Sequence, residues 1–175
     1  AIQHLGYDVI LTCNDKDVQK AEAIVLPGVG HFRDAMHSIE EKSIKDMLKN
    51  IHDKPIIGIC LGMQLLFQHS AEGDISGLEL VPGNIVPIQS SHPIPHLGWN
   101  ELKSTHPLLQ SDVYFVHSYQ AEMSEYVVAY ADYGTKIPGV IQYRNYIGIQ
   151  FHPEKSGTYG LEILNQALKG GFIND

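Results

Sequence analysis

A cysteine flanked by glycines stands between an apolar run and an amphipathic run. The stretch Gly58-Ile59-Cys60-Leu61-Gly62 matches the nucleophile-elbow form G-x-S-x-G, with cysteine in the serine position. Glycines two residues before and two after the nucleophile remove side chains that would clash where the chain turns sharply. The pattern predicts that Cys60 is a nucleophile whose thiol projects from the carboxyl edge of a sheet. The alternative is a structural cysteine buried in a strand, because free cysteine is among the most buried residue types.

The helix expected after Cys60 bears on the reactivity of its sulfur. A thiol at a helix N-terminus lies near the positive end of the helix dipole, so we expect its pKa to be lowered. The backbone N–H of Leu61 would point to the same side of the turn. Because such an N–H stabilises the negative oxygen of a tetrahedral intermediate, Leu61 is a candidate member of an oxyanion hole.

A histidine and a glutamate follow the last apolar run, in the stretch Gly148-Ile149-Gln150-Phe151-His152-Pro153-Glu154. In an extended segment the period of two places His152 and Glu154 on one face. A nucleophilic thiol needs an imidazole to take and return a proton, and that imidazole needs an acceptor to fix its tautomer. His152 is therefore predicted to be the general base and acid, and Glu154 its orienting partner. A surface histidine beside a solvated carboxylate is the alternative, which the order of the motifs along the chain disfavours.

A third glycine-rich stretch ends an earlier strand, in Leu26-Pro27-Gly28-Val29-Gly30. A loop with two glycines turns backbone N–H groups toward an anion, so Gly28 and Val29 are candidates for a second oxyanion contribution and for a wall of the substrate site. Pro-Gly turns after strands are common, and an ordinary turn is the alternative.

The composition excludes several classes of protein. The chain has 175 residues and a net charge of −8 with dispersed basic residues, which argues against nucleic acid as a partner. No apolar run is long enough to span a bilayer and no signal-peptide pattern occurs, so we expect a cytoplasmic protein without a membrane partner. H-E-x-x-H and C-x-x-C motifs are absent, so we expect no metal and no cofactor. Cys13 and Cys60 are expected to be free thiols, with Cys13 a small buried hydrophobe.

The elements that must position these residues follow a βα pattern in the first half of the chain and a β pattern in the second. In the first half we expect strands over 8–12, 23–26 and 55–59 and helices over 31–39, 43–50 and 61–69. Residues 1–6 are typical of a helix end with a glycine cap that leads into a strand. In the second half we expect closely spaced strands over 78–81, 85–88, 113–117, 127–131, 140–143 and 147–151, then a helix over 159–168. The fold class is α/β, with antiparallel hairpins in the second half.

Together these motifs resemble the class I, triad-type glutamine amidotransferases, on Gly-Ile-Cys-Leu-Gly-Met-Gln at 58–64 and Phe-His-Pro-Glu at 151–154. The resemblance covers essentially the whole chain. It implies a flavodoxin-like mixed sheet flanked by helices, and residues 1–175 as one type 1 domain. The family pattern begins with a strand and an Asp-Tyr-Gly...Gly-Asn loop that this sequence lacks, so we expect both to be missing from the domain.

Further stretches are similar to the glutaminase subunits of imidazole glycerol phosphate synthases: residues 27–30 with Phe32, residues 95–100 (Pro-His-Leu-Gly-Trp-Asn) and residues 114–119 (Tyr-Phe-Val-His-Ser-Tyr). The resemblance implies that the Gly28–Val29 peptide rotates to complete the oxyanion hole. It implies a glutamine site formed by Gly30, Gln64, Ser118 and Tyr119. It also implies a subunit interface and ammonia exit near Trp99, Tyr114 and Lys155. The alternatives for this last set are a hairpin with Trp99 in a core, a packed aromatic and a solvated lysine.

The implied reaction is hydrolysis of L-glutamine to glutamate and ammonia. The implied partner is a cyclase subunit, a (β/α)₈ barrel, that forms a heterodimer with this chain and uses the ammonia in histidine biosynthesis. It would release imidazole glycerol phosphate and a purine precursor. Three alternatives remain at this stage: another class I amidotransferase serving anthranilate, pyridoxal phosphate or purine synthesis, a cysteine peptidase or γ-glutamyl hydrolase, and a non-catalytic domain with the same fold.

Overall fold

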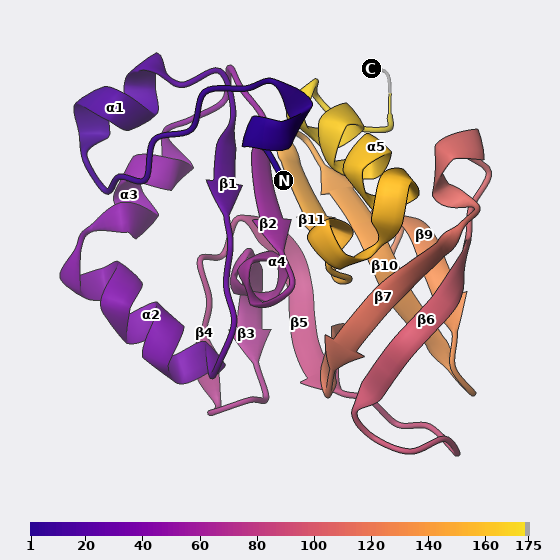
Figure 1. The fold of residues 1–175 in the computed structure, drawn as a ribbon. Helices are drawn as coiled ribbons and strands as arrows, with labels where there is room; N and C mark the ends of the chain where they lie inside the picture. Colours follow the sequence, from indigo (N-terminus) through magenta and orange to yellow (C-terminus); the bar gives the residue numbers. More distant parts are fainter. Residues whose placement is uncertain (174–175) are drawn as a thin grey trace.

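The computed structural model describes residues 1–173, which form two β-sheets with helices packed against them (Figure 1). The larger sheet has seven strands in the spatial order β1 (Ile24–Leu26), β2 (Ile56–Ile59), β11 (Tyr146–Ile149), β10 (Lys136–Tyr143), β9 (Val127–Asp132), β6 (His96–Lys103) and β7 (Asp112–His117). The smaller sheet has four, in the order β4 (Ile75–Ser76), β3 (Phe67–Ser70), β5 (Val81–Pro87) and β8 (Tyr119–Ala121).

The larger sheet changes character across its width. β1, β2 and β11 run parallel, whereas each pair from β11 through β10, β9 and β6 to β7 is antiparallel. The parallel strands are short apolar runs, of which β11 and most of β2 are buried while the edge strand β1 is half-buried. The predicted mixed sheet with helices and with antiparallel hairpins in the second half is therefore confirmed.

Within residues 1–173, five α-helices cover the strands: α1 (Asp15–Lys20), α2 (Phe32–Glu41), α3 (Ile44–Lys49), α4 (Leu61–Leu65) and α5 (Gly157–Leu168). Short 3₁₀ turns occur at Gln3–Leu5, Pro107–Leu109 and Pro153–Lys155. Figure 1 shows α1, α2 and α3 beside β1, and α5 on the other side near β7.

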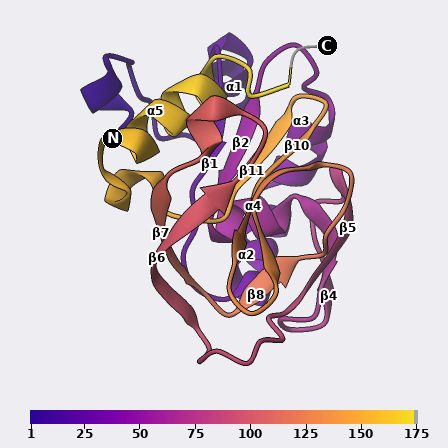
Figure 2. The ribbon, with the colours of Figure 1, turned by 90° about the vertical axis from the view of Figure 1, so that its right-hand side faces the viewer.

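The larger sheet separates two hydrophobic cores. Successive β2 residues point to opposite faces, so Ile56 packs with α2, α3 and α4 while Ile57 packs with α5 and the antiparallel strands. Phe32 and Phe67 are fully buried in the first core, and Phe115 and Phe151 in the second. Figure 2, turned toward the β6–β7 hairpin, shows this hairpin in front of the parallel strands.

Several secondary-structure elements predicted from the sequence have other bounds or another type in the structure, and the predicted burial of Cys13 is wrong. The expected strand over 8–12 does not form, and Val9, Ile10 and Leu11 are exposed. No strand of the described chain pairs with this segment, so its backbone forms no strand-to-strand hydrogen bonds despite the apolar pattern. The expected glycine cap is confirmed, because Gly6 is left-handed and donates to the Gln3 carbonyl. Cys13 is an exposed free thiol rather than a buried one.

The helix expected over 61–69 ends at Leu65, and a strand follows at Phe67. The carbonyls of Leu65, Leu66 and Phe67 accept hydrogen bonds from backbone N–H groups within residues 78–81, so they have no need of helical partners. This distant segment converts the second half of the predicted helix into β3. The helix α1 and the strands β3, β4, β6 and β8 are further elements that local patterns did not predict.

Candidate active site

Cys60 lies in a sharp turn between β2 and α4. Its φ of 55° and ψ of −113° are unusual for a residue with a side chain, as expected of a nucleophile elbow. The turn is tied to the sheet by a hydrogen bond of 2.8 Å from the Cys60 N–H to the Ile149 carbonyl. A Cβ added to Gly62 would fall on the Leu26 carbonyl, and one added to Gly58 would meet the backbone of α4. The two flanking glycines are therefore required by close backbone packing, which confirms the steric prediction.

The electrostatic prediction for Cys60 is wrong. Burial raises the pKa of the thiol above its ordinary value, and the lowering effect of the Leu61 backbone N–H is smaller. The negative charge of Glu154 also raises this pKa, while Lys155 lowers it. The helix α4 has only five residues, so its dipole does little to offset the loss of water around the sulfur. The thiol must therefore lose its proton to a neighbouring base when it reacts.

The base predicted from the sequence is in place beyond the end of β11. His152 is buried, and its Nδ1 lies 2.7 Å from Oε1 of Glu154. Since the carboxylate can only accept, Nδ1 donates and the tautomer leaves Nε2 as the proton acceptor. Glu154 is not on an extended strand as predicted, but in a 3₁₀ turn that brings it back to the imidazole.

The backbone of His152 is held by two contacts that fix its position. Its N–H donates to the Tyr114 carbonyl at 2.9 Å, and its carbonyl accepts from the Ser156 hydroxyl at 2.6 Å. The same hydroxyl accepts from the Tyr114 N–H at 2.9 Å, so β7 clamps the turn. Ser156 is fully buried and was not predicted; a serine soon after His-Pro-Glu is the only local signal for it.

The parallel pairing of β2 and β11 brings the two halves of the predicted triad to one sheet edge. Ile59 is opposite Ile149, so Cys60 and His152 leave adjacent strands at the same end. The influence of Glu154 on the Cys60 pKa agrees with this proximity. Within residues 1–173 no hydrogen bond joins the Cys60 sulfur to His152, an arrangement common in catalytic sites without substrate.

The loop that follows β1 lies against the elbow. A Cβ on Gly28 would stand 3.2 Å from the Leu61 Cβ and 3.2 Å from the Gly62 nitrogen, so the two predicted oxyanion segments are neighbours. Val29 is 81% exposed and Gly30 has a φ of 107° with open space around it. The elbow side of the candidate oxyanion hole is packed, whereas the loop side faces solvent.

Two of the predicted glutamine-binding residues, Gln64 and Tyr119, are joined by a hydrogen bond. The buried side chain of Gln64 donates from Nε2 to the Tyr119 carbonyl and to Gln150 Oε1, both at 3.0 Å. Ser118 lies between β7 and β8, where the chain passes from one sheet to the other, and its carbonyl accepts from the Ile88 N–H. Gln150 was not predicted; its Nε2 is a buried donor without a partner in the described chain.

The predicted interface residues are also neighbours. Trp99 and Tyr114 are opposite each other in the β6–β7 pairing, with ring centroids 6.0 Å apart, and the Lys155 ammonium lies 6.0 Å from the Tyr114 ring. Trp99 is 59% exposed, so the alternative of a core tryptophan is wrong. Leu97, beside Trp99 on β6, is exposed to the same extent of 59%. This apolar surface adjoins the triad through the Tyr114–His152 hydrogen bond.

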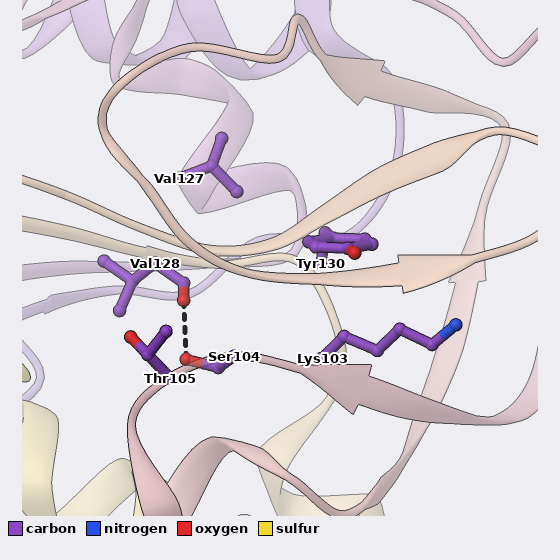
Figure 3. A pocket seen from close by; sticks show the side chains of 6 residues that line it. All are labelled: Lys103, Ser104, Thr105, Val127, Val128 and Tyr130. Atoms are coloured by element: carbon purple, nitrogen blue, oxygen red, sulfur yellow. Dashed lines mark hydrogen bonds between the residues drawn. The ribbon is translucent and has the colours of Figure 1, made fainter.

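Two open hollows lie away from the triad. One, of about 430 Å³, lies between β6 and β9, and there the Ser104 hydroxyl donates to the Val128 carbonyl at 2.7 Å (Figure 3). The other, of about 460 Å³, adjoins Pro55 at the start of β2, the opposite end of that strand from Cys60. Neither contains a residue of the candidate site. Residues 1–173 hold no cluster of metal-binding side chains and no helix long and apolar enough to cross a membrane.

Similar proteins point to one family. A model of the family "Glutamine amidotransferase class-I" matches residues 1–169. A relative from Staphylococcus epidermidis, described as imidazole glycerol phosphate synthase subunit HisH, is 98% identical over 100% of this chain and 91% of its own length. A relative of the same description from Staphylococcus saprophyticus is 65% identical over 100% of this chain and 88% of its own length. A crystal structure of a glutamine amidotransferase has a TM-score of 0.77 at 16% identity, over 97% of this chain and 90% of the other.

Proposed function

We infer that this chain, which belongs to the class I glutamine amidotransferase family, is the glutamine-hydrolysing subunit of an imidazole glycerol phosphate synthase. The observation that carries the proposal is the strained Cys60 turn beside the His152–Glu154 pair at one sheet edge. The names of the relatives from two Staphylococcus species support the choice of synthase.

The reaction begins when His152 Nε2 takes the proton of the Cys60 thiol and the sulfur attacks the side-chain carbonyl carbon of L-glutamine. The Leu61 N–H and the Gly28–Val29 peptide stabilise the resulting oxyanion. Collapse of this intermediate breaks the carbon–nitrogen bond, and the leaving nitrogen takes the proton from His152 to depart as ammonia. Water, deprotonated by His152, then cleaves the γ-glutamyl thioester, which yields glutamate and restores the thiol.

Glu154 has two roles in this scheme. Its hydrogen bond to Nδ1 holds the imidazole in the required tautomer and stabilises the imidazolium that forms after proton transfer. Its negative charge also adds to the effect of burial, which is the main cause of the raised pKa of the Cys60 thiol. Gly30, Gln64 and the backbone at Ser118 and Tyr119 would hold the amino-acid end of glutamine.

The partner we propose is the cyclase subunit of the synthase, a (β/α)₈ barrel that receives the ammonia in a heterodimer. The exposed apolar surface around Leu97 and Trp99, with Tyr114 and Lys155 beside it, supports an interface at the β6–β7 hairpin. Aromatic residues are typical anchors of protein interfaces. This surface adjoins the triad, so ammonia would leave the site toward the partner.

The test is glutamate release from L-glutamine by this chain, alone and with the cyclase subunit plus its ribonucleotide ligand. We expect slow hydrolysis alone and strong stimulation in the complex. Cys60→Ala should abolish glutamine-dependent activity and retain activity with added ammonia, because the cyclase does not use the thiol. Hydrolysis that is equal in both conditions would contradict the choice of partner, and a Cys60→Ala variant that still hydrolyses glutamine would contradict the mechanism.

A further inference from the structure

A buried hydrogen-bonded chain runs from the β6–β7 hairpin to the glutamine site. Asn100 Nδ2 lies 3.2 Å from His96 Nε2, and His96 Nδ1 lies 2.9 Å from His117 Nε2. His117 Nδ1 lies 2.7 Å from the Tyr119 carbonyl, which also accepts from Gln64. The two histidines face each other across the β6–β7 pairing, so the register of that hairpin brings them together. Neither histidine belongs to the catalytic triad.

The Tyr119 carbonyl ends this hydrogen-bonded chain, and it determines which nitrogen of each imidazole carries the hydrogen. A carbonyl can only accept, so His117 Nδ1 carries a hydrogen and its Nε2 accepts. His96 must then donate from Nδ1 and accept at Nε2, where the Asn100 amide supplies the hydrogen. Each ring is therefore a neutral imidazole that donates one hydrogen bond and accepts another. All donors in the hydrogen-bonded chain point from Asn100 toward Tyr119.

Burial keeps both rings neutral near physiological pH. It lowers the pKa of His117 to about 3 and that of His96 to about 4. Charge on His96 or on the catalytic His152 would lower the His117 pKa further. A neutral His117 adds no charge to oppose the imidazolium that forms at His152 during the reaction. It also retains the acceptor nitrogen that its bond with His96 requires.

The Tyr119 end of the hydrogen-bonded chain helps to fix the orientation of Gln64. Both amide hydrogens of Gln64 go to protein acceptors, namely the Tyr119 carbonyl and Gln150 Oε1. The Gln64 carbonyl oxygen is then the atom left to accept from an ammonium group. If the Tyr119 carbonyl turned away, Gln64 Nε2 would keep only Gln150 Oε1 as an acceptor, and the orientation of the Gln64 amide would be less firmly fixed. Tyr119 follows the Ser118 corner between the two sheets and begins β8, where it is opposite Pro87 of β5. Because proline has no N–H, Pro87 donates no hydrogen bond to the Tyr119 carbonyl.

We propose that His117, supported by His96, is a positioning residue that holds the Tyr119 carbonyl and, through it, the Gln64 side chain in the orientation that binds glutamine. The inference rests on the proposed function, because it assigns His117 a role in glutamine binding rather than in the chemical step. The effect of losing His117 should therefore appear in KM for glutamine more than in kcat.

The experiment compares His117→Leu and His117→Asn in the complex with the cyclase subunit. Leucine removes both ring nitrogens at similar volume, whereas the asparagine amide keeps a donor near the position of Nδ1. We expect His117→Leu to raise KM for glutamine about tenfold, the effect of one lost buried hydrogen bond, and to change kcat less than about threefold. His117→Asn should recover most of the loss. His37→Leu, on the exposed face of α2, is the matched control and should leave KM unchanged.

Two further readouts separate positioning from general damage. The rate of Cys60 alkylation by iodoacetamide and the ammonia-dependent activity of the complex should be the same in His117→Leu and the wild type. If His117→Leu does not fold, Asn100→Leu carries the test from the other end of the chain, with an expected rise in KM of about threefold. If the wild type is active and the folded His117→Leu variant has an unchanged KM for glutamine, the inference is overturned while the proposed function stands. The same holds for Asn100→Leu where that variant replaces His117→Leu. A wild type that does not hydrolyse glutamine overturns the proposed function and the inference together.

Discussion

Two strand-to-helix connections lie side by side at the same edge of the sheet, and they differ in how tightly they pack. The β2–α4 connection carries Cys60, and its flanking glycines press against neighbouring backbone. The β1–α2 connection carries Gly28, Val29 and Gly30, and its outer part is open to solvent. Both follow apolar parallel strands, and Leu26 is opposite Gly58 in the pairing.

The difference separates what must be rigid from what must move in the proposed mechanism. The nucleophile has to stay in one strained conformation, and the surrounding backbone leaves it no alternative. The second proposed oxyanion contributor lies in a loop where a Cβ added to Gly30 would meet nothing within 4 Å. Gly28 packs against Leu61 and Gly62, whereas Val29 and Gly30 are open, so we expect rotation of the Gly28–Val29 peptide to move the outer side of the loop.

The largest effect should follow from adding one methyl group to the packed connection. In Gly62→Ala the new Cβ would fall on the Leu26 carbonyl, so β1 and α4 must move apart. We expect the free energy of unfolding to fall by about 3 kcal/mol and glutamine hydrolysis to be lost. Urea denaturation and glutamate release measure the two quantities.

Gly30→Ala is the matched control in the open connection. Its Cβ meets nothing within 4 Å, and only the φ of 107° opposes it. We expect a loss of about 1–2 kcal/mol in stability and an unchanged rate of Cys60 alkylation by iodoacetamide. Equal losses of stability in Gly62→Ala and Gly30→Ala would contradict the contrast between the two connections.

A second substitution tests whether the open loop supplies an oxyanion donor. Val29→Pro removes the Val29 N–H, and Gly28 before it tolerates the backbone conformations that a proline imposes. Because the side chain is exposed, we expect stability to change by less than about 0.5 kcal/mol. The partner-stimulated kcat should fall about 100-fold to 1,000-fold, the usual cost of one lost oxyanion donor. Val29→Ala keeps the N–H, and it should retain the wild-type kcat; a Val29→Pro variant with that kcat would rule out the donor.

A smaller effect is expected in the pH dependence of thiol alkylation. The Cys60 pKa is raised above its ordinary value of 9.0, so its thiolate forms only at higher pH. In the isolated chain we expect the rate of Cys60 alkylation to rise about tenfold per pH unit from pH ~7 to ~9, without a plateau. Peptide mass spectrometry resolves this rate from that of the exposed Cys13, the internal control. A plateau below pH ~8 would show that the elbow lowers the pKa instead.

The residues of the candidate triad could be proposed from the sequence because each motif is local. The glycines around Cys60 and the spacing of His152 and Glu154 are visible within a few residues, and so is the apolar run of β2. The pKa of Cys60 was not predictable, because burial by distant segments outweighs the local helix effect.

Features that depend on pairing between distant segments could not be predicted from the sequence. The His96–His117 contact exists only because β6 and β7 pair in one register, and the two histidines are 21 residues apart. The same holds for the helix predicted over 61–69, because the carbonyls of Leu65, Leu66 and Phe67 bond to residues 78–81 rather than continue a helix. The segment 8–12 shows the reverse case, because its strand-like apolar pattern finds no partner in the described chain.

In the proposed mechanism Cys60 alone is the glutamine-directed nucleophile. The most direct measurement is reaction of the complex with a diazoketone analogue of glutamine, followed by peptide mass spectrometry. We predict one adduct, on the peptide containing Cys60, with an unmodified Cys13, no adduct in Cys60→Ala, and protection by L-glutamine. An adduct on Cys13, or a fully inert Cys60 in the presence of the partner and its ligand, would contradict the account.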